Sequence, residues 1–69
     1  MKLSARNILK GNVTLVKHGA INSEIIIQLS GGTQVVAVIT KESAENMELA
    51  PGKPVYAVIK ASNVMIATD

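Results

Sequence analysis

The segment Glu24-Ile25-Ile26-Ile27-Gln28-Leu29 constrains the fold most, because it is apolar on both faces of any strand that it forms. Successive side chains of a strand point to opposite sides, so a sheet on its own would leave part of this apolar surface in water. Such a strand is typically covered on one side by the core of its own chain and on the other by a partner subunit. The segment therefore indicates an oligomer.

The usual cross-links of small domains are missing from this chain. Its 69 residues include no cysteine and a single histidine, His18, which excludes disulfides and the common His/Cys metal cages. A monomer of about this size buries only about 60% of the surface that its unfolded chain exposes. We therefore expect one domain over residues 1–69, stabilised by self-association and without direct protein ligands to a metal.

Valine and isoleucine dominate the apolar residues, and this composition favours half-buried strands over helices. Polar and apolar residues alternate imperfectly in the first strand, and we expect a bulge or bend at Gly11. Ser30-Gly31-Gly32-Thr33 predicts a hairpin turn. The expected strands are Arg6–Val16, Ile21–Leu29, Gln34–Thr40, Pro54–Lys60 and Val64–Ala67.

A short helix is expected between the third and fourth strands. Thr40 can cap the free N–H groups of a helix over Lys41–Met47, and Glu42 in its first turn suits the positive end of the helix dipole. A Pro-Gly turn at Ala50–Lys53 then closes the helical segment. Three strands, a helix and two strands give an all-β fold, a five-stranded Greek-key barrel of the oligonucleotide/oligosaccharide-binding (OB) type.

Charge is unevenly distributed along the chain. The first 23 residues contain Lys2, Arg6, Lys10 and Lys17 but no acid. The net charge of +2 is too small to indicate a nucleic-acid partner by itself. Neither a signal peptide nor a run of about 18 apolar residues is present, so we expect a cytoplasmic protein with no membrane contact.

Three short segments combine cationic and hydroxyl side chains. Ser4 and Arg6 lie two residues apart, as do Lys60 and Ser62, while Thr40 and Ser43 lie where a strand passes into the helix. Two positive charges and several O–H or N–H donors are the groups that a small tetrahedral dianion requires. This pattern predicts an oxyanion site, although solvated surface charges and an ordinary helix cap would give the same residues.

The sequence resembles the molbindin (Mop) family of small molybdate-binding proteins over nearly its whole length. The resemblance is carried by Ser4-Ala5-Arg6-Asn7-Ile8-Leu9-Lys10-Gly11, by Ile39-Thr40-Lys41-Glu42-Ser43 and by Val58-Ile59-Lys60-Ala61-Ser62-Asn63-Val64-Met65-Ile66. It implies a barrel of this OB type, assembled as a hexamer (a trimer of dimers), that holds molybdate or tungstate at subunit interfaces. No other cofactor is implied.

The resemblance also implies which residues bind the oxyanion. One subunit would supply Ser4, Arg6, Lys60, Ala61 through its backbone N–H, and Ser62, while Thr40 and Ser43 would come from a neighbour. A possible second class of site, near the threefold axis, would be lined by the turn Lys17, His18, Gly19, Ala20 and Ile21. A lone histidine in a turn is more often an ordinary surface group.

The sequence also bears on three other functions. A nucleic-acid-binding barrel normally stacks bases on aromatic side chains, of which this chain has only Tyr56. A molybdate-sensing module would have to act through a separate partner. An enzyme is not expected, because no nucleophile–base pair is evident and Glu42, Glu45 and Glu48 have the spacing of a solvated helix face.

Overall fold

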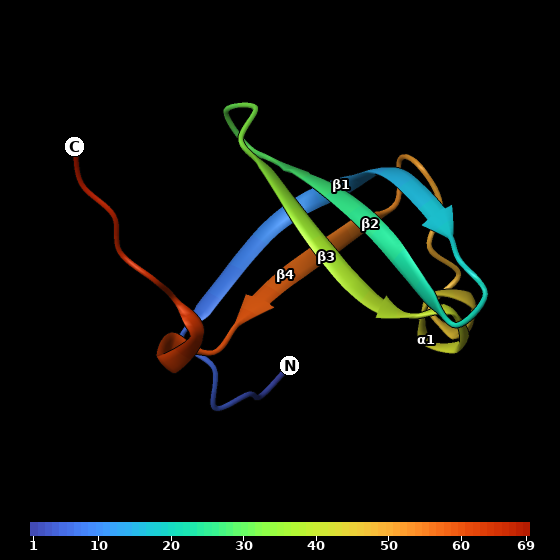
Figure 1. Ribbon diagram of the computed structural model, residues 1–69, viewed down its shortest axis with the longest axis horizontal. Helices are drawn as coiled ribbons and strands as arrows, with labels where there is room; N and C mark the ends of the chain where they lie inside the picture. Colours follow the sequence, from blue (N-terminus) through green and yellow to red (C-terminus); the bar gives the residue numbers. More distant parts are fainter.

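The computed structural model describes all 69 residues and shows a strongly curled antiparallel sheet with one short helix at its end (Figure 1). The sheet has four strands in the order β3-β2-β1-β4. Because β4 returns to pair with β1, this is the Greek-key order, as predicted. The strands are β1 (Asn7–His18), β2 (Asn22–Leu29), β3 (Gln34–Thr40) and β4 (Pro54–Ile59). The helical segments are α1 (Lys41–Asn46) and the single 3₁₀ turn η1 (Ala61–Asn63).

The core lies inside the curl of the sheet. Val13, Ile25, Ile27 and Ala57 point inward from three strands, and Ala44 of α1 covers one end of the same cluster. Successive side chains of a strand alternate between its two faces, so these strand residues share the inner face of the sheet. No helix in the structure has the length and apolar character required to span a bilayer.

Both predicted glycine turns and the helix cap are confirmed. Gly31 and Gly32 have φ values of 90° and 95° in the β2–β3 hairpin, a region of backbone conformation that favours glycine. The N–H of Lys53 donates to the carbonyl of Ala50 at 3.1 Å and closes the Pro-Gly turn. Thr40 accepts the N–H of Ser43 at 3.1 Å and so begins α1.

The irregularity in β1 lies at Thr14, so the expectation of a bulge or bend at Gly11 is wrong. Pairing with β2 is regular from Gly11 to Val13 and shifts by one residue before Leu15. Gly11 instead allows two strands to approach closely. A Cβ atom there would lie 2.6 Å from the carbonyl oxygen of Gln28 and 2.8 Å from Cγ2 of Ile27.

The predicted fifth strand, Val64–Ala67, is also wrong for the isolated chain. After η1 the backbone runs away from the sheet as an extended tail (Figure 1). No backbone group beyond Val64 makes a hydrogen bond within the chain. Alternating apolar residues favour a strand, but a strand forms only beside a partner edge, and this tail lies next to none. The barrel therefore remains open between β3 and β4.

The close approach at Gly11 makes a stability prediction. The Gly11→Ala substitution should lower the free energy of unfolding by about 1–3 kcal/mol, because the added methyl group overlaps backbone that cannot move freely. Urea denaturation at fixed protein concentration measures the change. The neighbouring exposed substitution Asn12→Ala serves as control and should stay within about 0.5 kcal/mol of the parent. Equal stability of Gly11→Ala and parent would contradict the close approach.

Candidate functional site

Two of the three donor segments predicted from the sequence meet at one end of the sheet. Antiparallel pairing of β1 with β4 places Asn7 opposite Ile59, so residues 4–6 and 60–62 leave the sheet at the same end. The side-chain amide of Asn7 donates to the carbonyl of Ile59 at 3.2 Å and joins the two segments. These two segments form the donor cluster, which consists of Ser4, Arg6, Lys60, Ala61 and Ser62.

The turn η1 shapes the second half of the donor cluster. The N–H of Asn63 donates to the carbonyl of Lys60 at 2.9 Å, and the N–H of Val64 donates to that of Ala61 at 3.3 Å. This bends the chain directly after β4 and leaves the residues of η1 exposed. The N–H groups of Ala61 and Ser62 are absent from the hydrogen bonds of this turn.

The donor cluster is positive and has no carboxylate of its own. Residues 1–23 and 49–68 contain no Asp or Glu. Arg6 and Lys60 are exposed and form no ion pair within the chain, whose one salt bridge joins Lys41 and Glu45 at 4.0 Å. Two unpaired cations beside hydroxyl and amide donors attract a dianion whose oxygens only accept hydrogen bonds.

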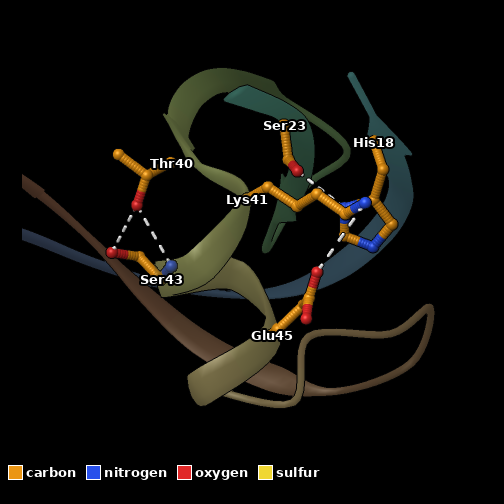
Figure 2. Close-up of polar contacts among 6 residues, drawn as sticks. All are labelled: His18, Ser23, Thr40, Lys41, Ser43 and Glu45. Atoms are coloured by element: carbon orange, nitrogen blue, oxygen red, sulfur yellow. Dashed lines mark hydrogen bonds and ion pairs between the residues drawn. The ribbon is translucent and has the colours of Figure 1, made fainter. Parts of the chain in front are cut away.

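The third donor segment lies at the start of α1, as the close-up in Figure 2 shows. Thr40 accepts the N–H of Ser43 at 3.1 Å, and its own hydroxyl donates to Oγ of Ser43 at 2.8 Å. The Thr40 hydroxyl thus both donates and accepts a hydrogen bond within the cap. The O–H of Ser43 remains free to donate to another group.

Within one chain this segment does not reach the donor cluster. Thr40 pairs with Asn22, near the His18 end of β1, whereas the donor cluster lies beyond the Asn7 end. Twelve residues at about 3.3 Å each make β1 on the order of 35 Å long when extended. The predicted site therefore consists of two halves at opposite ends of the molecule.

The turn predicted as a second site, Lys17 to Ile21, lies beside the start of α1. The N–H of Lys41 donates to the carbonyl of Ile21 at 2.8 Å, and the N–H of Gly19 donates to that of Asn22 at 2.7 Å. His18 is exposed at the end of β1, where Nδ1 lies 2.6 Å from Oγ of Ser23 (Figure 2). The turn is thus fixed to both the helix and β2.

Ser23 is a buried residue that was not predicted from the sequence. Its side chain is 1% exposed, the one fully buried polar side chain of the core, and His18 is its partner. Ser23 lies on the inward face of β2, two residues before Ile25 and four before Ile27, so the alternation of that strand could have predicted its burial. No group of three or more His, Cys, Asp or Glu side chains is placed to hold a metal ion.

The structure is thus a small, open Greek-key β domain with a cationic end that carries no carboxylate. Comparison with known proteins shows the family to which this domain belongs. Residues 3–66 match the TOBE domain. The chain is 41% identical to molybdenum-pterin-binding protein 3 of Clostridium pasteurianum, over 96% of this chain and 97% of that protein. It belongs to the molbindin (Mop) family of TOBE domains.

Longer proteins contain similar domains. The chain is 49% identical along its whole length to molybdenum transport protein ModE of Azotobacter vinelandii, but spans only 26% of that protein. Its fold matches a crystal structure of the cytoplasmic molybdate-binding protein ModG with molybdate bound, with a TM-score of 0.91 and 48% identity. That match covers 94% of this chain and 46% of the ModG chain.

The contact between His18 and Ser23 gives a stability prediction. His18→Ala leaves the buried Ser23 hydroxyl without a partner and should lower the free energy of unfolding by about 1–3 kcal/mol. The double variant His18→Ala/Ser23→Ala should recover part of this loss, because it also removes the hydroxyl. Chemical denaturation of the parent, both single variants and the double variant forms the cycle. Additive effects of the two substitutions would show that the contact contributes nothing.

Proposed function

We propose that this protein binds molybdate, and the similar oxyanion tungstate, reversibly and without chemical conversion. The site would lie between two copies of the chain, with the donor cluster of one copy facing Thr40 and Ser43 of another. The observation that carries the proposal is the convergence of Arg6 and Lys60 at a sheet end that lacks any carboxylate. The family membership and the molybdate bound to ModG support the same ligand.

The available donors are sufficient for useful affinity. Arg6 and Lys60 balance the two negative charges, and the hydroxyls of Ser4, Ser62 and Ser43 with the Ala61 N–H supply further bonds. Charge-assisted hydrogen bonds contribute about 1.5–3 kcal/mol each. Five or six of them, discounted for desolvation, give binding that is roughly micromolar or tighter.

Donor chemistry and size together would select the ligand. Molybdate carries no proton near neutral pH, so all its oxygens accept, whereas phosphate keeps a proton that needs an acceptor. A cavity that offers only donors leaves that proton unpaired, at a cost of roughly 1–3 kcal/mol. Sulfate has the same charge and the same hydrogen-bond acceptors as molybdate. The site would therefore have to discriminate by size, with a cavity that fits the larger molybdate ion. Tungstate should bind about as well as molybdate.

The proposed role is intracellular storage and homeostasis of the oxyanion, in the cytoplasm, by a homo-oligomer such as the expected hexamer. The relatives of similar length are named as molybdenum-pterin-binding proteins, and ModG is described as cytoplasmic. A second candidate is a molybdate-sensing module, which the 49% identity to a quarter of ModE favours. In both roles the chain binds the oxyanion and has no catalytic step.

Loss of either cation should weaken molybdate binding. Arg6→Ala and Lys60→Ala should each reduce affinity by about 10-fold to 100-fold, because each removes a charge-assisted hydrogen bond of about 1.5–3 kcal/mol. Isothermal titration of molybdate into each variant measures the change. The matched control is Lys10→Ala, an exposed cation on the same strand β1 but outside the donor cluster. Full affinity in Arg6→Ala would contradict the assignment.

A further inference from the structure

A single side-chain hydrogen bond joins the two segments of the donor cluster. The amide of Asn7, the first residue of β1, donates to the carbonyl of Ile59, the last residue of β4, at 3.2 Å. The two residues lie 52 positions apart in the sequence, and the contact is partly buried. It is the only side-chain hydrogen bond at this end of the sheet. No backbone hydrogen bond outside the sheet involves residues 1–6.

This hydrogen bond fixes the path of the chain into η1. The carbonyl of Ile59 and the N–H of Lys60 belong to one planar peptide group, so holding the carbonyl also sets the direction in which the backbone enters Lys60. Lys60 itself has φ of −62° and ψ of 131°, and its carbonyl accepts the N–H of Asn63 at 2.9 Å. Asn7 is therefore connected through fixed groups to the turn that carries the donor N–H groups.

Asn7 also determines where the other segment of the donor cluster begins. Arg6 directly precedes Asn7, and Lys60 directly follows Ile59, so each cationic residue has its Cα atom about 3.8 Å from one member of the hydrogen-bonded pair. Figure 1 shows both segments at the same end of the sheet. The separation of the Arg6 and Lys60 backbones thus depends on the contact between Asn7 and Ile59.

A fixed separation is what recognition by size requires. A donor cluster of constant width leaves some of its donors too far from the smaller sulfate ion, whereas a cluster that is free to contract closes on either anion. Supporting hydrogen bonds commonly hold binding groups in place in this way. We propose that Asn7 is a positioning residue that sets the width of the donor cluster and thereby its preference for molybdate over sulfate. This inference rests on the proposed function.

The positioning role differs measurably from a direct contact with the ion. Loss of a direct donor would weaken both anions alike, because the oxygens of both accept hydrogen bonds. Loss of the fixed width would weaken molybdate more than sulfate. Asn12 provides a matched control, since it lies opposite Pro54 at the other end of the pairing between β1 and β4. Its side chain is exposed and makes no hydrogen bond within the chain.

The first test replaces the amide by an apolar group of similar size in Asn7→Leu. Isothermal titration of molybdate, alone and in competition with sulfate, gives the affinity for each anion. Molybdate affinity should fall by about 10-fold and sulfate affinity by about twofold or less, so the preference falls by about fivefold or more. Asn12→Leu should leave both affinities within about twofold of the parent.

A second variant, Asn7→Asp, keeps the shape of the side chain, but its ionised carboxylate cannot donate to the carbonyl of Ile59. Its charge repels both dianions alike, so the ratio of the two affinities still reports the width of the cluster and should fall as in Asn7→Leu. The carbonyl carbon-13 NMR signal of Ile59 in the ligand-free protein provides a direct signature of the hydrogen bond. It should shift in both Asn7 variants and stay unchanged in Asn12→Leu.

Each of the other outcomes overturns the inference. An unchanged preference in both Asn7 variants would show that Asn7 does not set the width, and an equal loss for both anions would show a direct or general contribution. An unshifted signal of Ile59 would show that the hydrogen bond is absent. A parent protein that binds no molybdate would overturn the proposed function as well, whereas a parent that binds it beside variants of unchanged preference overturns the role of Asn7 alone.

Discussion

The antiparallel pairing of β1 with both β2 and β4 holds the rest of the structure in place. It curls the sheet around Val13, Ile25 and Ala57, and Gly11 lets the strands approach closely enough for this curl. The same pairing aligns Asn7 with Ile59. Two segments more than fifty residues apart in sequence thereby leave the sheet together, and the donor cluster is a consequence of this register.

The sheet leaves a large apolar surface exposed on and beside its edge strand β3. Val36 and Val38 of β3 are 61% and 67% exposed, and an apolar groove of about 450 Å³ at the open side of the sheet is lined in part by the core residues Val13, Ile25 and Ile27. A chain of about this size buries only about 60% of the surface that its unfolded form exposes, and this one has no disulfide to add stability. A second copy covering these surfaces would provide the missing stabilisation. It would also bring the two halves of the proposed oxyanion site together.

The features that local chemistry determines were predictable from the sequence. Thr40 as a helix cap, Gly31-Gly32 in a hairpin and the Pro-Gly turn each depend on a few neighbouring residues, and all are confirmed. The predicted bulge at Gly11 was wrong because a glycine in a strand can indicate either an irregular backbone or a close approach of two strands. The sequence pattern alone does not distinguish between the two. The fifth strand was wrong because strand formation depends on a partner edge distant in sequence.

The site was predictable only in part. Ser4, Arg6, Lys60 and Ser62 stand out as donors in the sequence, and the strand register brings their segments to one end of the sheet. Their assignment to an oxyanion, and the contribution of Thr40 and Ser43 from a neighbour, come from resemblance to the family and remain predictions. The His18–Ser23 contact was not predicted, because a single serine in an apolar strand does not indicate which residue it will hydrogen-bond to.

Subunit complementation tests the two-part site most directly. An Arg6→Ala protein and a Thr40→Ala/Ser43→Ala protein each carry a defect in a different half of the proposed site, so each alone should bind molybdate weakly. Under the proposal, an equal mixture refolded together would form some interfaces at which an intact donor cluster faces an intact Thr40 and Ser43. Native mass spectrometry should then detect bound molybdate on the mixed assemblies and little on either variant alone. Mixed assemblies that bind no more molybdate than the separate variants would contradict a site shared between copies.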